Sequence, residues 1–404
     1  MSTSKQADRA TRPFDIVVFG ATGFTGQLVC EYLARNTDPG TTRWAIAGRS
    51  REKLEGVRRR LAELDPRCAA LELLEARSDD RPSLDDMAAR ARVVLTTVGP
   101  YALHGRELIA ACVDAGTDYV DLTGEPDFWQ AAIEAHHERA VVNEALIVSC
   151  CGFDSVPHDL GALYTVQKLA IKPGERATVR GYITARGSFS GGTWSSLVNA
   201  LANLRTSGGA RVGSQKGKAL QFSREIGRWA LRMPTIDPLV VRRSAAFVSD
   251  YGDDFHFRLS ITFRSIFQVV GLGAFLGATA LLAQTRPTRR LLQRLRPSGA
   301  GPSPEQRARS FFRVTFFGEA GDRQVTTRVS GGDPGYDETA KMISEAALAL
   351  AHDRERLPAR GGVLTPAAAL GDVLRARLEA AGIRFELLGP RGDVSHPATA
   401  GAEA

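Results

Sequence analysis

Three glycines near the start of the chain have the spacing of a phosphate-binding turn. Gly20, Gly23 and Gly26 directly follow the apolar run at residues 16–19, and apolar residues then recur at helical spacing across residues 28–33. A strand, a glycine turn and a helix in this order leave backbone N–H groups open at the positive end of the helix, where a diphosphate can bind. The spacing G-x-x-G-x-x-G is a variant of the dinucleotide fingerprint, so we favour nucleotide binding over a purely structural turn.

The end of the second predicted strand indicates which nucleotide would bind. Residues 43–47 form this strand, and Gly48, Arg49 and Ser50 follow it. A unit for NAD(H) would place Asp or Glu there for the ribose 2′-OH, whereas the guanidinium of Arg49 can form paired, charge-assisted hydrogen bonds to a 2′-phosphate. The Ser50 hydroxyl can add a contact. We therefore expect NADP(H), the alternative being that Arg49 is an ordinary surface arginine at a helix start.

The pattern that follows predicts a doubly wound parallel α/β sheet of the Rossmann type. Strand and helix periodicities alternate up to about residue 150. The predicted helices cover residues 50–64, 82–89, 106–115 and 127–143, and the predicted strands cover residues 69–74, 92–97, 118–122 and 146–150. Ligands of such sheets lie beyond the carboxyl ends of the strands, so candidate site residues are expected there.

The strand at residues 92–97 ends in a segment that should pass near the nicotinamide ribose. Thr97, Gly99 and Pro100 lie there, and Gly99 with Pro100 fixes a turn. Tyr101 and His104 are then the first side chains that could supply or relay a proton near the transferred hydride. For either residue, a packing or hydrogen-bonding role is the alternative.

A second group of polar residues follows the strand at residues 146–150. Asp154, Ser155 and His158 lie in the sequence C-G-F-D-S-V-P-H-D-L, and a helix should begin near Pro157. Ser155 could cap that helix, whose first N–H groups would face the same edge of the sheet. Ser155 and His158 therefore join the candidate catalytic residues, with Asp154 as an orienting group or an acceptor at the helix start.

Five motifs in this order and spacing resemble the saccharopine dehydrogenase-like oxidoreductases. They are G-A-T-G-F-T-G, A-G-R-S, T-T-V-G-P-Y, D-Y-V-D-L-T-G-E and C-G-F-D-S-V-P-H-D-L. Within that family the chain is most similar to the trans-acting enoyl reductases of actinobacterial lipid and polyketide synthesis. The second half shares with this subgroup F-S-G-G-T at 189–193, V-R-R-S at 241–244, G-D-P-G-Y at 332–336 and G-V-L-T-P-A-A-A-L-G-D at 362–372.

The resemblance implies an NADP-linked reductase that saturates a carbon–carbon double bond in an acyl chain carried by a separate synthase. It assigns cofactor contacts to Gly20, Thr22, Gly23, Phe24, Thr25 and Arg49. Positions around the predicted turn and strand ends add further members to the same site. These are Gly26, Ser50, Thr97, Gly99 and Pro100.

The expected reaction is hydride addition to the β-carbon of an α,β-unsaturated acyl group, with protonation at the α-carbon. Negative charge grows on the carbonyl oxygen during the addition, so the site needs hydrogen-bond donors there and an acid nearby. Tyr101 and Ser155 are candidate donors, together with the N–H groups that lead into the helix at Pro157. Tyr101, His104 and His158 are candidate acids or relays.

Two other functions are weighed against this one. A non-catalytic, membrane-associated nucleotide-binding scaffold would have no chemical need for the polar residues at the strand ends. A saccharopine-type oxidoreductase acting on an imine or ketone of amino-acid metabolism would keep the cofactor and change the substrate, but no local motif for gripping a dicarboxylic amino acid is evident. Family membership indicates fold and cofactor more securely than substrate.

Length and cysteine usage favour a two-domain enzyme of the cytoplasm. The chain has 404 residues, which exceeds the usual size of one core. Its five cysteines include no C-x-x-C pair, and the adjacent His136 and His137 cannot share a helix face, so we expect a reducing compartment and no metal site. The first thirteen residues lack the apolar core of a signal peptide. We expect a cytoplasmic protein, with peripheral contact at the inner face of the membrane as an alternative.

Positive charge is concentrated in two blocks of the second half. Residues 205–243 and residues 286–313 each carry an excess of seven basic residues, although the net charge of the whole chain is +7. These blocks could face anionic lipid, an acidic carrier protein or synthase, or the phosphates of a large substrate, the alternative being a solvated surface. No nucleic-acid-binding motif accompanies them, so we expect no nucleic-acid partner. A homo-oligomer is compatible with the sequence.

The expected domain organisation has four parts. They are a disordered start at 1–13, an NADP-binding Rossmann domain at 14–160, an α+β substrate domain at 161–388 and a disordered tail at 389–404. The substrate domain should contain strands at 179–187 and 255–263, a hairpin at 311–317 and 324–329, and helices at 192–204, 336–352 and 366–380. The last two helices could return to the first domain.

The segment at residues 265–284 contains no charged residue. Its length is at the lower limit for a bilayer span, but a span would separate residues 311–372 from the rest of the substrate domain. We therefore favour a helix or hairpin that docks on the membrane surface or lines an acyl tunnel, over a buried core helix and a true span. Arginines flank the segment on both sides, namely Arg264, Arg286, Arg289, Arg290, Arg294 and Arg296.

Overall fold

The computed structural model describes residues 9–38, 40–187, 198, 218–232, 235–295 and 302–389. Four predictions lie wholly or largely outside these residues. They are the disordered start at 1–13, the disordered tail at 389–404, the helix at 192–204 and the motif at 189–193. The described part of the start is ordered, since the buried Arg12 donates to the carbonyl oxygen of Ala91 at 2.7 Å.

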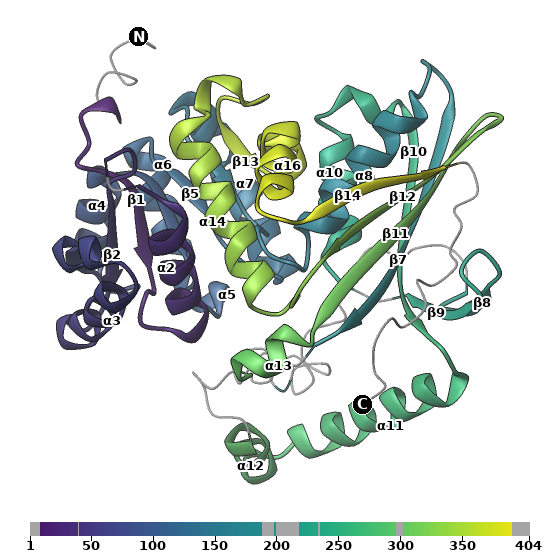
Figure 1. The fold of residues 1–404 in the computed structure, drawn as a ribbon, viewed down its shortest axis with the longest axis horizontal. Coiled ribbons are helices and arrows are strands. Elements are labelled where there is room, and N and C mark those ends of the chain that lie inside the picture. The colour runs from purple at the N-terminus through teal and green to yellow at the C-terminus, as the bar shows by residue number, and fades with distance from the viewer. Residues whose placement is uncertain are drawn as a thin grey trace.

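The first sheet consists of seven parallel strands, and it confirms the predicted doubly wound fold (Figure 1). The order of its strands is β13-β6-β5-β4-β1-β2-β3. The strands are β1 (Phe14–Phe19), β2 (Trp44–Gly48), β3 (Glu72–Glu75), β4 (Ala91–Thr96), β5 (Asp118–Val120), β6 (Leu146–Val148) and β13 (Gly362–Leu364).

Helices cover both faces of this sheet, so its strands are buried on both sides. Ile16 and Val18 of β1 pack into one core, while the alternating Val17 and Phe19 pack into another. The first core is closed by α2 (Phe24–Asn36), α3 (Arg51–Leu64) and α14 (Asp337–His352), and the second by α4 (Arg81–Arg90), α6 (Arg106–Ala115) and α7 (Pro126–Val142). The strand ends are therefore the part of the sheet left for a ligand.

The second sheet is mixed and has the order β14-β12-β11-β7-β10-β9-β8. Only β7 and β10 pair in parallel, and the other neighbours are antiparallel. The predicted hairpin is present as β11 and β12. The strands are β7 (Arg176–Arg186), β8 (Leu220–Ser223), β9 (Arg228–Arg232), β10 (Asp254–Phe263), β11 (Phe311–Ala320), β12 (Arg323–Gly331) and β14 (Arg384–Gly389).

Helix α8 (Val156–Leu169) connects the two sheets and is buried along almost its whole length. It begins shortly after β6 and packs against β11 and β12 of the second sheet. A Cβ on Gly161 would overlap the ring of Phe316, so the helix lies this close to β11 only with glycine there. Thr165 adds a hydrogen bond of 2.7 Å to the hydroxyl of Thr327 on β12. The start of α8 is thereby held at the carboxyl edge of the first sheet.

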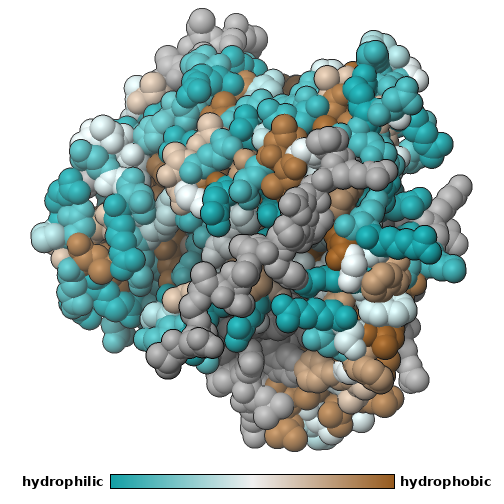
Figure 2. Space-filling view, turned by 45° about the vertical axis from the view of Figure 1, so that its right-hand side comes forward, coloured by the Kyte–Doolittle hydropathy of each residue, from teal (hydrophilic) through white to brown (hydrophobic). Residues whose placement is uncertain are grey.

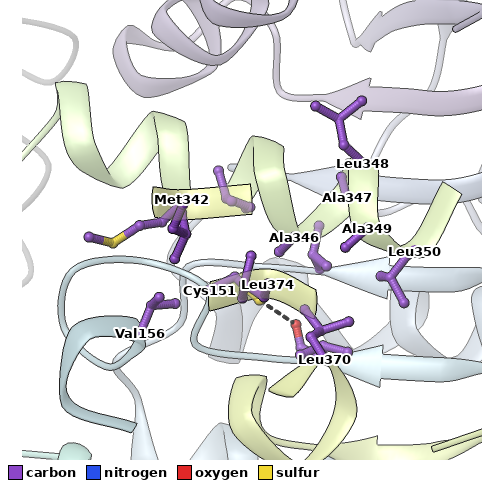
Figure 3. Packing of buried hydrophobic residues seen from close by; sticks show 14 of the residues in the cluster. Cys151, Val156, Met342, Ala346, Ala347, Leu348, Ala349, Leu350, Leu370 and Leu374 are labelled. Carbon is purple, nitrogen blue, oxygen red and sulfur yellow. Dashed lines mark hydrogen bonds between the residues drawn. The ribbon is translucent and has the colours of Figure 1, made fainter. Parts of the chain in front are cut away.

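The C-terminal part of the chain contributes to both sheets. Helix α14 packs on α2, and Met342, Ala346 and Leu350 of α14 belong to the same buried cluster as Leu370 and Leu374 (Figure 3). Strand β13 then adds an edge to the first sheet beside β6, and β14 adds an edge to the second sheet beside β12. The two units are therefore interleaved along the sequence.

Several elements differ from the prediction. The helix expected at 366–380 is divided into α15 (Pro366–Ala369) and α16 (Gly371–Ala380), because Gly371 adopts a left-handed φ of +49°. The sequence patterns did not predict β8, β9, β13 or β14. The remaining elements are α5 (Tyr101–His104), α10 (Asp237–Ala245), α11 (Ile266–Ala283), α12 (Arg286–Leu295), α13 (Pro304–Ala308), and the 3₁₀ turns η1 (Pro66–Ala70), η2 (Ser249–Tyr251) and η3 (Arg354–Arg356).

Candidate active site

The glycine turn after β1 fits a diphosphate. Gly20 has a φ of +92°, and a Cβ built there would lie 2.7 Å from Cγ2 of Val98. A Cβ on Gly26 would overlap the carbonyl oxygen of Gly20, so α2 can approach the turn this closely only with glycine. Gly23 is the N-cap residue of α2, and it has no side chain that could hydrogen-bond the first N–H groups of the helix. The first N–H groups of the helix are thus available to a ligand anion.

Arg49 is placed to bind a 2′-phosphate. It directly follows β2, is exposed, and has no ion-pair partner within the described ranges. The next arginine, Arg51, pairs instead with Glu55 and Glu75 at 3.6 and 4.0 Å. Ser50 accepts a hydrogen bond from the first turn of α3, and its O–H can still donate to the same phosphate.

Phe24 and Thr97 hold the glycine turn against the rest of the protein. The hydroxyl of Thr97 donates to the carbonyl oxygen of Gly20 at 3.3 Å, which ties the end of β4 to the turn. The ring of Phe24 meets that of Tyr336 edge to face, with 5.1 Å between centroids and an angle of 88°. The G-D-P-G-Y motif of the second half therefore lies at the start of α2. Two further predicted contacts are half-buried at this turn, namely Thr22 and Thr25.

The geometry of Tyr101 does not agree with its predicted role as a proton donor. The Tyr101 O–H donates to the carbonyl oxygen of Thr96 at 3.3 Å, and the Tyr101 hydroxyl oxygen accepts a hydrogen bond from the Leu122 N–H at 3.1 Å. Burial raises the pKa of Tyr101 well above its usual value. The Tyr101 N–H donates to the Glu125 carboxylate at 2.8 Å. Tyr101 therefore joins the ends of β4 and β5 and has no free O–H for a substrate.

Gly99, Pro100 and His104 belong to the same turn. The peptide between Gly99 and Pro100 is cis, and α5 begins directly after it. Nδ1 of His104 hydrogen-bonds Oγ of Ser78 at 3.1 Å. Ser78 follows β3, on the half of such a sheet that binds adenosine. This contact directs His104 toward the adenosine half rather than toward the residues that follow β6.

Asp121 was not among the predicted site residues, and it joins the ends of β5 and β6. The N–H groups of Thr123 and Cys150 donate to its carboxylate, both at 3.0 Å. The hydroxyls of Tyr119 and Ser149 donate to it at 2.9 and 3.2 Å. Burial nevertheless raises the pKa of Asp121 to about 6. The D-Y-V-D motif thus fixes the strand ends around which the polar residues lie.

The backbone donors predicted at the start of α8 are already used. The N–H groups of Ser155 and Val156 donate to the carbonyl oxygen of Gly152 at 3.1 and 2.9 Å, and the His158 N–H donates to that of Ser155 at 3.0 Å. Pro157 has no N–H. The prediction that these groups face a substrate oxygen is therefore wrong, and the side chains remain as donors.

Two buried side-chain atoms at the start of α8 have no hydrogen-bond partner among the described residues. Ser155 is 1% exposed, and its hydroxyl does not cap the helix, contrary to the prediction. His158 is 2% exposed, and its Nε2 is also unpartnered. Because buried polar groups are almost always hydrogen-bonded, Ser155 Oγ and His158 Nε2 indicate a place for polar atoms of a ligand.

The other ring nitrogen of His158 is held by a carboxylate. Nδ1 lies 2.6 Å from Oδ1 of Asp237 and 3.1 Å from the carbonyl oxygen of Asp154. Burial disfavours the charged imidazole, but the interactions with Asp237 and Asp154 outweigh it and raise the pKa of His158 above its usual value. Nδ1 holds a proton against Asp237, so Nε2 is the atom that can give or take one.

Asp237 was not among the residues predicted from the sequence. This residue lies 79 positions after His158 and begins α10, in a part of the chain where no motif was assigned a chemical role. The one local signal is the Asp-Pro pair, which is typical of a helix start and says nothing about a distant histidine.

Asp154 combines access to solvent with a raised pKa. Asp154 is exposed, while burial of its carboxyl group by the surrounding protein and the nearby Asp237 carboxylate raise its pKa to about 6. A Cβ on Gly124 would lie 3.7 Å from Oδ2 of Asp154, so the loops after β5 and β6 meet here. Asp154 can therefore exchange protons with water close to His158.

Asp159, the neighbour of His158, is equally buried but its carboxylate is fully engaged. The hydroxyl of Ser244 donates to it at 2.5 Å, and the Ala367 N–H donates at 2.8 Å. Ser244 also shares a hydrogen bond of 2.6 Å with the hydroxyl of Thr365. The V-R-R-S and G-V-L-T-P motifs thus meet at α8, where they hold the helix in place.

The fold and the site together define an NADP-dependent oxidoreductase. An open helix start, an exposed arginine after β2 and proton-holding side chains after β6 suit hydride transfer from a phosphorylated dinucleotide. The family model of the saccharopine dehydrogenase NADP binding domain matches residues 16–148, which confirms the predicted cofactor. Among the described residues, no group of three or more His, Cys, Asp or Glu is arranged to hold a metal ion.

Full-length relatives then identify the family. A trans-acting enoyl reductase of Mycobacterium tuberculosis is 37% identical over 417 residues, covering 93% of this chain and 97% of the relative. One of Mycobacterium ulcerans is 36% identical over 414 residues with the same coverage. The chain therefore belongs to the family of the trans-acting enoyl reductases. Apo saccharopine dehydrogenase (L-Glu forming) from Saccharomyces cerevisiae shares the fold, with a TM-score of 0.55, 13% identity, and coverage of 93% of this chain and 99% of that one.

Proposed function

We propose that the protein reduces the carbon–carbon double bond of an α,β-unsaturated acyl thioester in lipid or polyketide synthesis, with NADPH as the hydride donor. The full-length likeness to relatives named trans-acting enoyl reductases is the observation that carries the choice of this bond. Reduction of an imine or ketone of amino-acid metabolism is the weaker candidate. The likeness to saccharopine dehydrogenase is 13% in identity and concerns the fold alone.

The first half of the sheet edge would hold the cofactor. The open start of α2 would bind its diphosphate, and the Arg49 guanidinium would bind its 2′-phosphate. Bound there, NADPH supplies the hydride. Tyr101 and Asp121 fix the ends of the next strands, so that an acyl group placed beside them keeps a constant orientation.

Ser155 is the proposed donor to the carbonyl oxygen of the acyl group. Negative charge grows on that oxygen when hydride adds to the β-carbon, and a buried donor stabilises it without prior rearrangement. The hydroxyl of Ser155 has no partner among the described residues and lies at the positive end of α8. Loss of one such donor typically lowers kcat by about 10²–10³-fold.

His158 is the proposed acid that protonates the α-carbon from Nε2. Its raised pKa favours the protonated ring, and Asp237 orients that ring through Nδ1. Asp237 is thus a positioning residue. Asp154 reaches solvent beside this pair and could return a proton to it after each turnover.

We propose further that a separate carrier protein or synthase presents the acyl chain. Arginines on and beside the second sheet favour an acidic partner. Burial and the neighbouring Arg264 and Arg313 lower the pKa of Arg228, and none of these three arginines has a carboxylate partner among the described residues. An acidic carrier would relieve their mutual repulsion.

Oxidation of NADPH by the purified protein tests the proposed reaction. We expect turnover with 2-enoyl thioesters on pantetheine or on a carrier, and a product heavier by two hydrogens. The matching saturated thioesters should give none. Turnover of saccharopine with NADP⁺, in place of enoyl thioesters, would select the amino-acid reaction. Binding of NADPH without turnover of any of these substrates would favour a non-catalytic scaffold.

A further inference from the structure

Helix α11 is apolar, yet the protein leaves most of it uncovered. Its mean hydropathy is 2.0, it contains no charged residue, and 17% of it is buried. By length and composition it is the one helix among the described residues that could cross a bilayer. The interpretation of residues 265–284 as a buried core helix is therefore wrong.

The exposed side of α11 forms a continuous apolar stripe. Thr279 and Ala283 are buried on the side that faces the protein. Figure 2 shows apolar surface gathered along the lower edge of the molecule, where α11 lies in Figure 1. A helix exposed only to water would place polar residues there. The stripe consists of Phe267, Val270, Phe275, Leu281 and Leu282, which are 81%, 62%, 52%, 75% and 47% exposed.

The connections of α11 argue against a transmembrane span. Strand β10 leads directly into the helix, and the chain returns through α12 and α13 to β11. Both β10 and β11 pair with β7, so the segments before and after α11 belong to one sheet. They must lie on the same side of a membrane. A membrane-bound α11 would therefore lie along the interface.

Positive charge accompanies the stripe along the sequence. Between residues 255 and 304 the sequence contains seven arginines and neither Asp nor Glu. Arg264 just before α11 and Arg290 in α12 are both exposed. An acidic protein would match these charges but not the apolar stripe, whereas a bilayer with anionic headgroups matches both.

We propose that α11 docks the protein on the surface of a bilayer that contains anionic lipid. The stripe enters the boundary between acyl chains and headgroups, and Arg264 and Arg290 bind headgroup phosphates. Docking uses no residue of the cofactor or catalytic site, although Arg264 also belongs to the surface proposed for the carrier. It would place the second sheet beside an apolar phase that can hold long acyl chains.

Co-sedimentation with vesicles of phosphatidylcholine, with and without phosphatidylglycerol, tests the docking. We expect binding to the anionic vesicles that weakens with salt. Phe267→Glu should lower the bound fraction at least about tenfold, because it places a charge where the docked protein would bury apolar area in the bilayer. The matched control is Val142→Glu on α7, at a residue 75% exposed, and it should bind like the parent.

The arginines have their own variants and control. Arg264→Gln with Arg290→Gln should weaken binding to anionic vesicles by about tenfold or more, since each arginine near such a surface contributes about fivefold. Arg176→Gln, at an exposed arginine on β7, should have no effect. Unchanged NADPH affinity in all variants shows that they are folded.

Three results would overturn the proposal. The first is a parent protein that does not bind anionic vesicles. The second is equal loss of binding in Phe267→Glu and Val142→Glu. The third is a dimer that Phe267→Glu dissociates while the parent ignores vesicles, which would assign the stripe to a second copy of the chain.

Discussion

The two halves of the sheet edge that forms the site are built by different means. Around β1 and β2 the groups offered to a ligand are backbone N–H groups and one exposed side chain, Arg49. Around β5 and β6 they are buried side chains, Ser155 and His158, with Asp237 brought in from the second half of the chain. The first half suits a phosphorylated dinucleotide, and the second half holds the residues proposed to carry the reaction. Changes in the first should alter cofactor binding, and changes in the second should alter turnover.

Gly26→Ala should have the largest effect on cofactor binding. The new Cβ overlaps the carbonyl oxygen of Gly20, so the turn must open and its N–H groups move away from the diphosphate. We expect NADPH affinity to fall by at least about 100-fold, and stability by about 1–3 kcal/mol. Gly56→Ala on α3 is the control, because its Cβ meets nothing nearer than 3.9 Å. Calorimetric titration measures the NADPH affinity of both variants. A parent-like affinity in Gly26→Ala would contradict the account.

His158→Gln should remove turnover and leave cofactor binding intact. Loss of a general acid typically lowers the rate by about 10²–10⁴-fold. NADPH affinity should stay within a factor of about two, because His158 lies outside the glycine turn. Tyr101→Phe is the comparison, since its hydroxyl is already bonded to backbone, and it should keep most of kcat while losing about 1 kcal/mol of stability. Equal losses of kcat in both variants would return Tyr101 to the list of acids.

Arg49→Gln should change the choice of cofactor. A charge-assisted, paired hydrogen bond to the 2′-phosphate is worth about 1.5–3 kcal/mol, so the Kd for NADPH should rise by about 10–100-fold. The Kd for NADH should not change. Arg51→Gln serves as control because Arg51 already pairs with Glu55 and Glu75. If Arg51→Gln alone lowers NADPH affinity, the phosphate lies beside Arg51.

Asp237→Asn should shift the pH dependence of turnover. Asp237 raises the pKa of His158, so the protonated, active ring persists to higher pH. Loss of that charge lowers the pKa, and the fall of kcat with rising pH should move to lower pH by about one unit. Asp254→Asn, at an exposed carboxylate on β10, should leave the profile unchanged. An unshifted profile in Asp237→Asn would mean that His158 does not set it.

Ser244→Ala should affect stability and leave turnover unchanged. It removes a donor to the buried Asp159 carboxylate and a partner of Thr365, at a cost of about 1–3 kcal/mol in the free energy of unfolding. Urea unfolding measures this loss. The folded fraction should keep the kcat and NADPH affinity of the parent. A lowered kcat in fully folded Ser244→Ala would show that Asp159 takes part in the reaction.

Local pattern explains what could be predicted from the sequence. The glycine turn, Arg49 and the strands up to β6 follow from the spacing of neighbouring residues, and the structure places each of them within a few residues of the prediction. A strand-end position indicates that Tyr101 lies near the site. It does not indicate that the Tyr101 hydroxyl is already bonded to backbone groups, which does not agree with the predicted role as a proton donor.

Distant pairing explains what could not be predicted. Strand β13 has three residues and pairs in parallel with β6, more than two hundred positions earlier, and such pairing leaves no local signature. The contact between Asp237 and His158 also joins residues that are far apart in the sequence, because it forms through the packing of α10 on α8. The exposure of α11 could not be predicted from the sequence either, because an uncharged run of this length suits a core helix as well as an interfacial one.

The most direct test follows the transferred hydrogen. The purified protein is incubated with a 2-enoyl thioester and NADPH that carries deuterium at the transferred position, and the product is examined by mass spectrometry and NMR. The account predicts a saturated thioester with one deuterium on the β-carbon and a solvent hydrogen on the α-carbon. An intact enoyl thioester beside bound NADPH, or a saturated product without deuterium on the β-carbon, would contradict it.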